Sequence, residues 1–270
     1  MTGEREPWDK TKLIRSLRAA KAPNELIQRI VTHIEKDLYD GMSTSDIYAH
    51  AFNLLKREHR PIAAEYSLKK AMLQLGPSGF PFERFVAHIL TAQGYNTKVG
   101  VMVRGQCVTH EVDVVAEKND ERMLVEAKFH NSAAIRSDVK VALYVHARFQ
   151  DIEKRFENED GEGRYTHAWL ITNTEFTSQA IQYGRCAGLA LTGWNYPKGN
   201  TLQDLIQATK MHPLTCLTTL TDKHKLQLLQ NGTVLCREVI NNPLQLQRIG
   251  ISKARISSIL DEGRALCEIE

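Results

Sequence analysis

Residues 108–129 read VTHEVDVVAEKNDERMLVEAKF, and this stretch decides how the middle of the chain folds. Two valine-containing runs, at about 108–117 and 122–129, flank the polar residues 118–120. Such runs joined by a short polar turn are typical of a β-hairpin. A third run at about 96–103 precedes a glycine-containing turn, so we expect a meander of three antiparallel strands.

Helical patterns surround these strands. Apolar residues over 82–90 recur at helical spacing, and Gly94 ends that helix. After the strands we expect, in order, a long helix at about 137–156, a strand at 168–172, a helix at 178–186 and a strand at 189–194. Helices before and after a strand meander predict an α/β fold with a central mixed sheet flanked by helices.

Two glycine- and proline-containing breaks divide the chain. Gly76-Pro77-Ser78-Gly79 follows a helical segment at 8–75, and Pro197-Lys198-Gly199-Asn200 precedes a second one. We therefore predict an all-helical N-terminal domain (1–76), the α/β domain (77–197) and a small helical C-terminal domain (198–270).

The charge of the chain is balanced overall but not along its length. The 270 residues carry a formal net charge of +3, with 42% hydrophobic and 25% charged residues, which excludes a disordered acidic or basic tail protein. Residues 1–75 hold 13 basic and 10 acidic side chains, residues 76–197 hold 13 and 15, and residues 198–270 hold 9 and 7. A slightly acidic middle segment suits a cluster of carboxylates better than a uniformly basic surface.

Cysteine usage and hydropathy favour a cytoplasmic protein. The five cysteines are odd in number and scattered, and none forms a CxxC pair, which argues against a disulfide framework or a zinc ribbon. No apolar run approaches the ~20 residues of a membrane span, and the first ten residues have no signal-peptide core.

The predicted hairpin concentrates charged residues whose chemistry is specific. Side chains alternate along a strand, so Asp113 would face away from Val112 and Val114, and a lone acid among valines is costly without a partner. On the next strand, Glu126 and Lys128 share a face, ~7 Å apart. Strand pairing would bring two carboxylates and one ammonium group together.

Such a trio suits phosphodiester hydrolysis. Asp113 and Glu126 would hold Mg²⁺ (or Mn²⁺ in its place), with Glu83 of the preceding helix as a third acid. Lys128 would orient the attacking water and offset negative charge in the transition state. The alternative is a solvated sheet face with a weak Glu–Lys pair.

The arrangement resembles the PD-(D/E)xK nuclease superfamily, and more closely the Mrr-type restriction endonucleases. The matching segments are 82–86, 110–113, 125–129, 169–173 and 193–194. The resemblance implies metal ligands at Asp113 and Glu126, a catalytic lysine at Lys128 and a helix acid at Glu83. The leading proline of the family motif is Val112 here.

Residues 2–72 resemble an ATP-cone, a small helical module that binds ATP or dATP as a regulator. The matching residues are 3–9 with Lys12, then Thr44 and Ile47, then 64–69. The resemblance implies phosphate contacts from Lys12 and Lys69. The strand that opens the family's fold has no counterpart before Gly3, which predicts that half of the usual phosphate contacts are absent. A four-helix docking or dimerisation domain is the alternative.

The C-terminal segment resembles a helix-hairpin-helix. Residues 244–255 contain a glycine turn, and Lys253 and Arg255 would contact DNA phosphates. A helical bundle that only supports the nuclease domain is the alternative.

These features predict a Mg²⁺-dependent DNA endonuclease regulated by ATP or dATP. Because duplex DNA has two scissile strands, we expect a homodimer or a higher oligomer. A non-catalytic, nucleotide-responsive DNA-binding regulator is the alternative. Known ATP-cone repressors, however, carry a four-cysteine zinc ribbon that is absent here.

Overall fold

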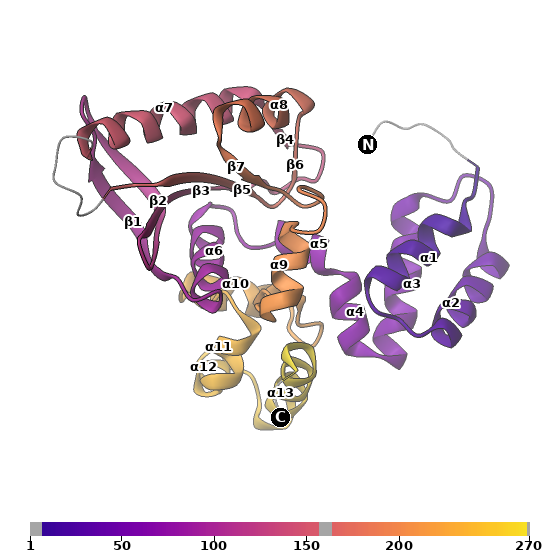
Figure 1. The fold of residues 1–270 in the computed structure, drawn as a ribbon. Helices are drawn as coiled ribbons and strands as arrows, with labels where there is room; N and C mark the ends of the chain where they lie inside the picture. Colours follow the sequence, from indigo (N-terminus) through magenta and orange to yellow (C-terminus); the bar gives the residue numbers. More distant parts are fainter. Residues whose placement is uncertain (1–6, 157–163, 269–270) are drawn as a thin grey trace.

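A five-stranded mixed sheet forms the centre of the computed structural model, which describes residues 7–156 and 164–268 (Figure 1). Residues 3–6 of the ATP-cone motif lie outside the described residues. Strands β1 (Asn96–Arg104), β2 (Thr109–Lys118) and β3 (Glu121–Lys128) pair antiparallel. Strands β5 (His167–Thr172) and β7 (Ala190–Thr192) extend the sheet parallel to β3, in the order β1-β2-β3-β5-β7. The predicted meander and mixed sheet are confirmed.

Helices cover both faces of this sheet (Figure 1). Helix α6 (Phe80–Ala92) lies on one face, and α7 (Val139–Phe156) and α8 (Ser178–Ala187) lie on the other. Two hydrophobic clusters result, one including Phe82 and Phe85 of α6 and the other including Val145 of α7. The long helix begins two residues later than predicted, because β4 (Arg136–Ser137) pairs with β6 (Glu175–Phe176) in a separate two-stranded sheet.

The regular alternation expected along β2 breaks at Asp113. Val114 packs in the cluster of α6, whereas Val112 packs in the cluster of α7, so these valines do not share a face as predicted. The break coincides with Gly100 on β1, which has φ +64 and leaves the β1–β2 register without a pair at Gly100 and Asp113. A left-handed residue in β1 thus lies opposite the acid at which the ladder is interrupted and the alternation of β2 changes.

The N-terminal region is helical, as predicted. It comprises α1 (Lys10–Ala19), α2 (Asn24–Asp37), α3 (Thr44–Glu58), α4 (Arg60–Tyr66) and α5 (Leu68–Leu73). Ser43 and Asp46 form a capping box at the start of α3. Helices α4 and α5 are divided at Ser67. Helices α1–α4 share one cluster, whereas Leu68 and Met72 of α5 pack with α6.

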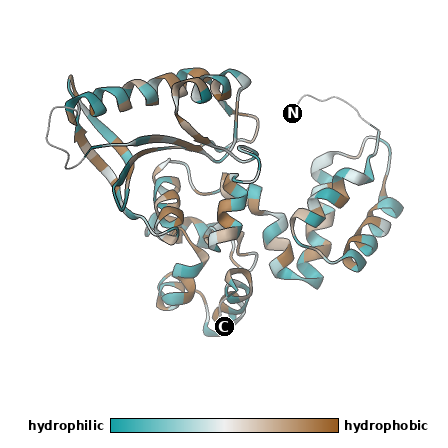
Figure 2. Ribbon diagram, viewed as in Figure 1, coloured by the Kyte–Doolittle hydropathy of each residue, from teal (hydrophilic) through white to brown (hydrophobic). Residues whose placement is uncertain are grey.

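The C-terminal region is also helical. It comprises α9 (Leu202–Thr209), a 3₁₀ turn (Leu214–Cys216), α10 (Asp222–Gln230), α11 (Cys236–Asn241), α12 (Leu244–Arg248) and α13 (Lys253–Cys267). Their apolar faces, brown in Figure 2, join the cluster of α5 and α6. His212 Nε2 lies 2.7 Å from Glu65 Oε1, which ties this region to α4.

In residues 7–156 and 164–268, no helix combines the length and apolar character that a membrane span needs.

Candidate active site

Asp113 of β2 and Glu126 of β3 lie side by side in the sheet. The register pairs Val114 with Val125, so the next position on each strand carries an acid. Asp113 Oδ2 also accepts a hydrogen bond of 2.8 Å from the backbone N–H of Ala127. Lys128 follows at the exposed end of β3. The structure thus brings together the three residues that the sequence predicted to meet.

Glu83 of α6 adds a third acid to this cluster. It lies in the first turn of α6, where Pro81 and Phe82 are buried against the sheet. Burial raises the pKa of Glu83 to about 7, and the charges of Asp113, Glu111 and Glu126 add to the shift. Glu83 is therefore within electrostatic reach of both strand acids.

Burial also acts on the strand acids themselves. It raises the pKa of Asp113, although the hydrogen bond from Ala127 and the charge of Arg148 oppose the shift. Burial likewise raises the pKa of Glu126, and the charge of Asp113 raises it further. Three carboxyl groups that repel one another in a half-buried position are stabilised by a nearby cation.

Arg148 supplies one such cation, and the sequence interpretation missed it. This guanidinium belongs to α7, is 8% exposed and lies 2.5 Å from Glu126 Oε2. It also stacks on the Tyr144 ring, 4.5 Å from the centroid. A signal was present, because Arg148 follows Ala142 and Val145 on the buried stripe of α7, where an unpaired charge would be costly.

The donor set fits a hard divalent cation. Glu83, Asp113 and Glu126 offer carboxylate oxygens, the ligands that Mg²⁺ prefers, and their raised pKa values indicate that charge remains to be neutralised. The three side chains do not bring their oxygens within 4.8 Å of one another as a set. Asp113 and Glu126 instead hold protein donors, so binding a cation would require small rotations of these side chains.

Two histidines beside the motif have structural partners. His110 Nε2 lies 2.8 Å from Asp151 Oδ2 of α7, and this carboxylate also accepts from the backbone N–H of Cys107 at 2.8 Å. His130 donates its backbone N–H to Asn173 Oδ1 at 2.8 Å, and Asn173 Nδ2 returns a bond to the His130 carbonyl. These contacts hold the β1–β2 turn and the end of β3 in place.

A separate cavity of about 640 Å³ lies beside the N-terminal helices. Lys12 of α1 and Lys69 of α5 both line it, together with Trp8 and Tyr48. Trp194 and Gln203, from the α/β and C-terminal regions, close one side. The two lysines expected to contact phosphate therefore face one ligand-sized space.

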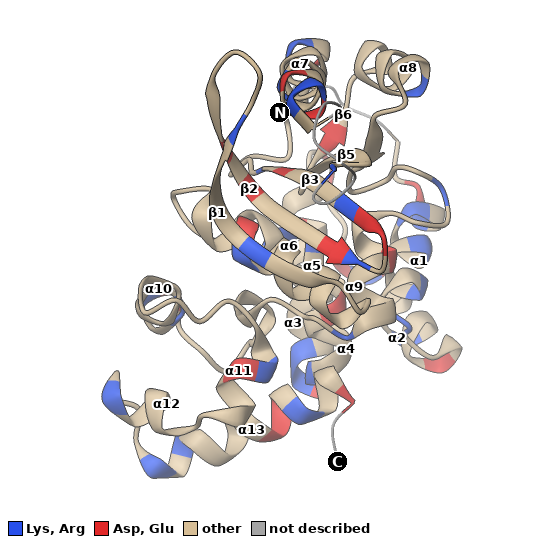
Figure 3. Cartoon of the chain, turned by 60° about the vertical axis from the view of Figure 1, so that its left-hand side comes forward, with Lys and Arg blue, Asp and Glu red and all other residues tan. Residues whose placement is uncertain are grey.

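The two C-terminal residues predicted to contact DNA differ in how free their side chains are to do so. Lys253 is exposed at the start of α13. Arg255 donates a 3.0 Å hydrogen bond to the Thr219 carbonyl, so its guanidinium is partly engaged. Figure 3 shows basic segments on α11, α12 and α13, and Gly250 between the last two has φ +84.

Comparisons with known proteins agree with this geometry. A family model described as "Restriction endonuclease" (Mrr_cat) matches residues 76–205, "ATP cone domain" matches 2–71, and "AF1548-like, C-terminal" matches 212–267. An uncharacterized protein of Archaeoglobus fulgidus is 36% identical over 181 residues, which are 66% of this chain and 98% of that protein.

A solved structure supports the same relationship. The crystal structure of AF1548, a protein of unknown function, is 34% identical, with 71% of this chain and 99% of that chain covered and a TM-score of 0.57. The chain therefore belongs to the same family as AF1548, and it contains a restriction-endonuclease (Mrr_cat) domain with an ATP cone domain before it and an AF1548-like domain after it.

Proposed function

We propose that this protein is a Mg²⁺-dependent DNA endonuclease whose activity responds to ATP or dATP. The observation that carries the proposal is the juxtaposition of Asp113, Glu126 and Glu83, with raised pKa values, beside Lys128. A solvated surface pair would not leave three half-buried acids within electrostatic reach of one another. The restriction-endonuclease match supports phosphodiester hydrolysis in the same domain.

Each side chain has a distinct role in this proposal. Asp113, Glu126 and Glu83 would hold Mg²⁺, which when bound supplies electrophilic stabilisation of the scissile phosphate and a more acidic water. Lys128 would orient the attacking water and stabilise charge that develops on the phosphoryl oxygens. Arg148 would position Glu126 through its ion pair and keep it ionised.

A plasmid-nicking assay tests the endonuclease proposal. Wild-type protein with Mg²⁺ should convert supercoiled DNA to nicked or linear forms, and Asp113→Ala and Lys128→Ala should lose at least roughly 100-fold in rate. Lys98→Ala, a lysine exposed on β1, is the matched control and should cleave normally. Normal cleavage by Lys128→Ala would contradict the assigned mechanism. Intact plasmid together with nucleotide-dependent DNA binding would favour the regulator.

Nucleotide control is proposed from the N-terminal cavity. Its two lysines suit phosphate groups and its aromatic lining suits a base. Calorimetry should detect ATP or dATP binding to the wild type and weaker binding to Lys12→Ala and Lys69→Ala. The exposed Lys70→Ala is the control. Equal binding by all four proteins would contradict the assignment of this cavity.

Further features of the proposal concern assembly and DNA contacts. A homodimer would place two active sites against the two strands of duplex DNA. Lys253 and Arg255 are proposed to contact DNA phosphates. The domain bounds at 76 and 197 stay predictions, as does a cytoplasmic location.

A further inference from the structure

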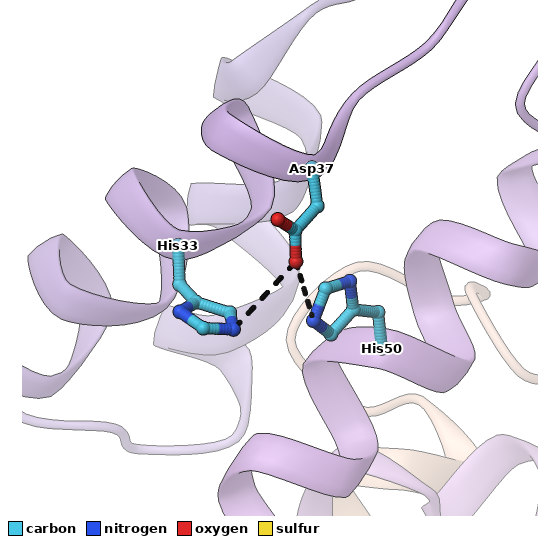
Figure 4. Close-up of side chains that lie close together, drawn as sticks. All are labelled: His33, Asp37 and His50. Carbon is cyan, nitrogen blue, oxygen red and sulfur yellow. Dashed lines mark ion pairs between the residues drawn. The ribbon is translucent and has the colours of Figure 1, made fainter.

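A compact group of metal-binding side chains lies in the N-terminal domain, apart from both sites described above. His33 and Asp37 of α2 and His50 of α3 point toward one another (Figure 4). One ligand atom from each lies within 4.8 Å of the other two. Among the described residues, no other group of three His, Cys, Asp or Glu side chains meets this criterion.

The distances are close to those of a zinc site. Asp37 Oδ2 lies 3.7 Å from His33 Nε2 and 3.5 Å from His50 Nε2. A tetrahedral Zn²⁺ with bonds of roughly 2.0–2.1 Å separates neighbouring ligand atoms by about 3.3 Å. The two distances from Asp37 therefore exceed this separation by only a few tenths of an ångström, and the imidazole nitrogens of the two histidines lie within 4.8 Å of each other.

The backbone places these ligands and favours a positive charge between them. His33 and Asp37 are four residues apart and share a face of α2, while His50 approaches from α3. Asp37 is the last residue of α2, where the helix dipole disfavours a carboxylate unless a cation is near. The rings of His33 and His50 meet edge to face at 5.2 Å, and each ring directs its Nε2 toward Asp37.

We propose that His33, Asp37 and His50 bind Zn²⁺ or a similar borderline transition-metal ion. Two imidazole nitrogens and one carboxylate oxygen suit such an ion and not Mg²⁺, which prefers oxygen ligands. The exposure of His33 and Asp37 leaves a fourth position open to water.

The ion would join the two helices that flank one wall of the N-terminal cavity. Asp37 immediately precedes residues 38–42, which line that cavity, and His50 follows the lining residues Ile47 and Tyr48 by less than one turn. Zinc at this position would restrain the connection between α2 and α3. The proposal does not depend on nuclease activity or on nucleotide binding.

Calorimetric titration of the full chain with ZnCl₂, in excess Mg²⁺ to saturate oxygen-only sites, tests the proposal. Wild type should bind one equivalent, and His33→Ala, Asp37→Asn and His50→Ala should each weaken binding at least about tenfold. His59→Ala, an exposed histidine at the end of α3, is the matched control and should bind like wild type. Unchanged binding in the three ligand variants would overturn the proposal.

Cobalt substitution of the wild type gives a second readout that needs no variant. Co²⁺ bound by two imidazoles and a carboxylate should show visible d–d bands without the near-ultraviolet charge transfer of thiolate ligands. Thiolate bands would assign the ion to the cysteines, and the absence of any tetrahedral signature would likewise reject the site.

Discussion

Asp113 lies where the alternation of β2 breaks, and it is also a proposed metal ligand. It interrupts a buried run between Val112 and Val114, and these neighbours pack in different hydrophobic clusters. The sequence predicted that this acid needs partners. It accepts a hydrogen bond from Ala127, and its charge interacts with those of Glu126 and Arg148. Strict alternation did not predict this break, which coincides with Gly100 in the neighbouring strand.

The carboxyl group of Glu83 should make the stability of the metal-free protein depend on pH. Its pKa is raised to about 7 in the fold, so the stability it contributes is complete below about pH 4.5 and is lost as pH rises through about 7. Urea unfolding from pH 5 to 8 should show this decline in the wild type. Glu83→Gln should flatten the slope, whereas the exposed control Glu25→Gln should keep it. Added Mg²⁺ should reverse the decline, and an unchanged slope in Glu83→Gln would contradict the assignment.

Helix α7 contributes one buried charge, that of Arg148, to the site. The sequence predicted a long helix here, and Arg148 lies beside Val145 among the buried residues of that helix. Periodicity alone cannot tell which acid meets this guanidinium, because the partner lies 22 residues earlier on β3. Packing of α7 on the sheet decides the pairing with Glu126.

Replacing Arg148 alone should destabilise the protein more than replacing Arg148 and Glu126 together. Arg148→Met leaves Glu126 unpaired at low exposure, and such a loss typically costs about 3–5 kcal/mol of unfolding free energy. The double variant Arg148→Met/Glu126→Gln should recover most of this loss. Lys140→Met, exposed on the same helix, is the control and should change stability by less than about 0.5 kcal/mol. Equal stability of the single and double variants would argue against the ion pair.

At the scale of the whole molecule, contacts between distant segments join the three regions. Helix α5 packs with α6 and with the C-terminal helices in one cluster, and Thr215 bonds to the Ala71 carbonyl at 2.8 Å. The cavity of Lys12 and Lys69 is closed by Trp194 and Gln203. The sequence predicted the three regions but none of these contacts between them.

The contact between His212 and Glu65 should weaken at high pH. Burial alone would lower the pKa of His212, but hydrogen bonds to Cys267 and Glu65 raise it to about 9. The stability that this raised pKa provides is complete below about pH 6.5 and is lost as pH rises through about 9. His212→Gln should therefore destabilise the protein at pH 6 by up to roughly 3 kcal/mol, and less at pH 9. The exposed His167→Gln is the control, and a pH-independent difference in unfolding free energy would contradict the prediction.

Local patterns in the sequence determined the helices, the strand meander, the capping box of Ser43 and the candidate acids, because each depends on residues close together in the chain. Tertiary structure alone decided the Arg148–Glu126 pair, the cavity that spans the regions and the meeting of His33, Asp37 and His50. These features join residues from separate elements, and only the packing of those elements sets their distances. The break in alternation at Asp113 is a further example, since it coincides with Gly100 on the adjacent strand.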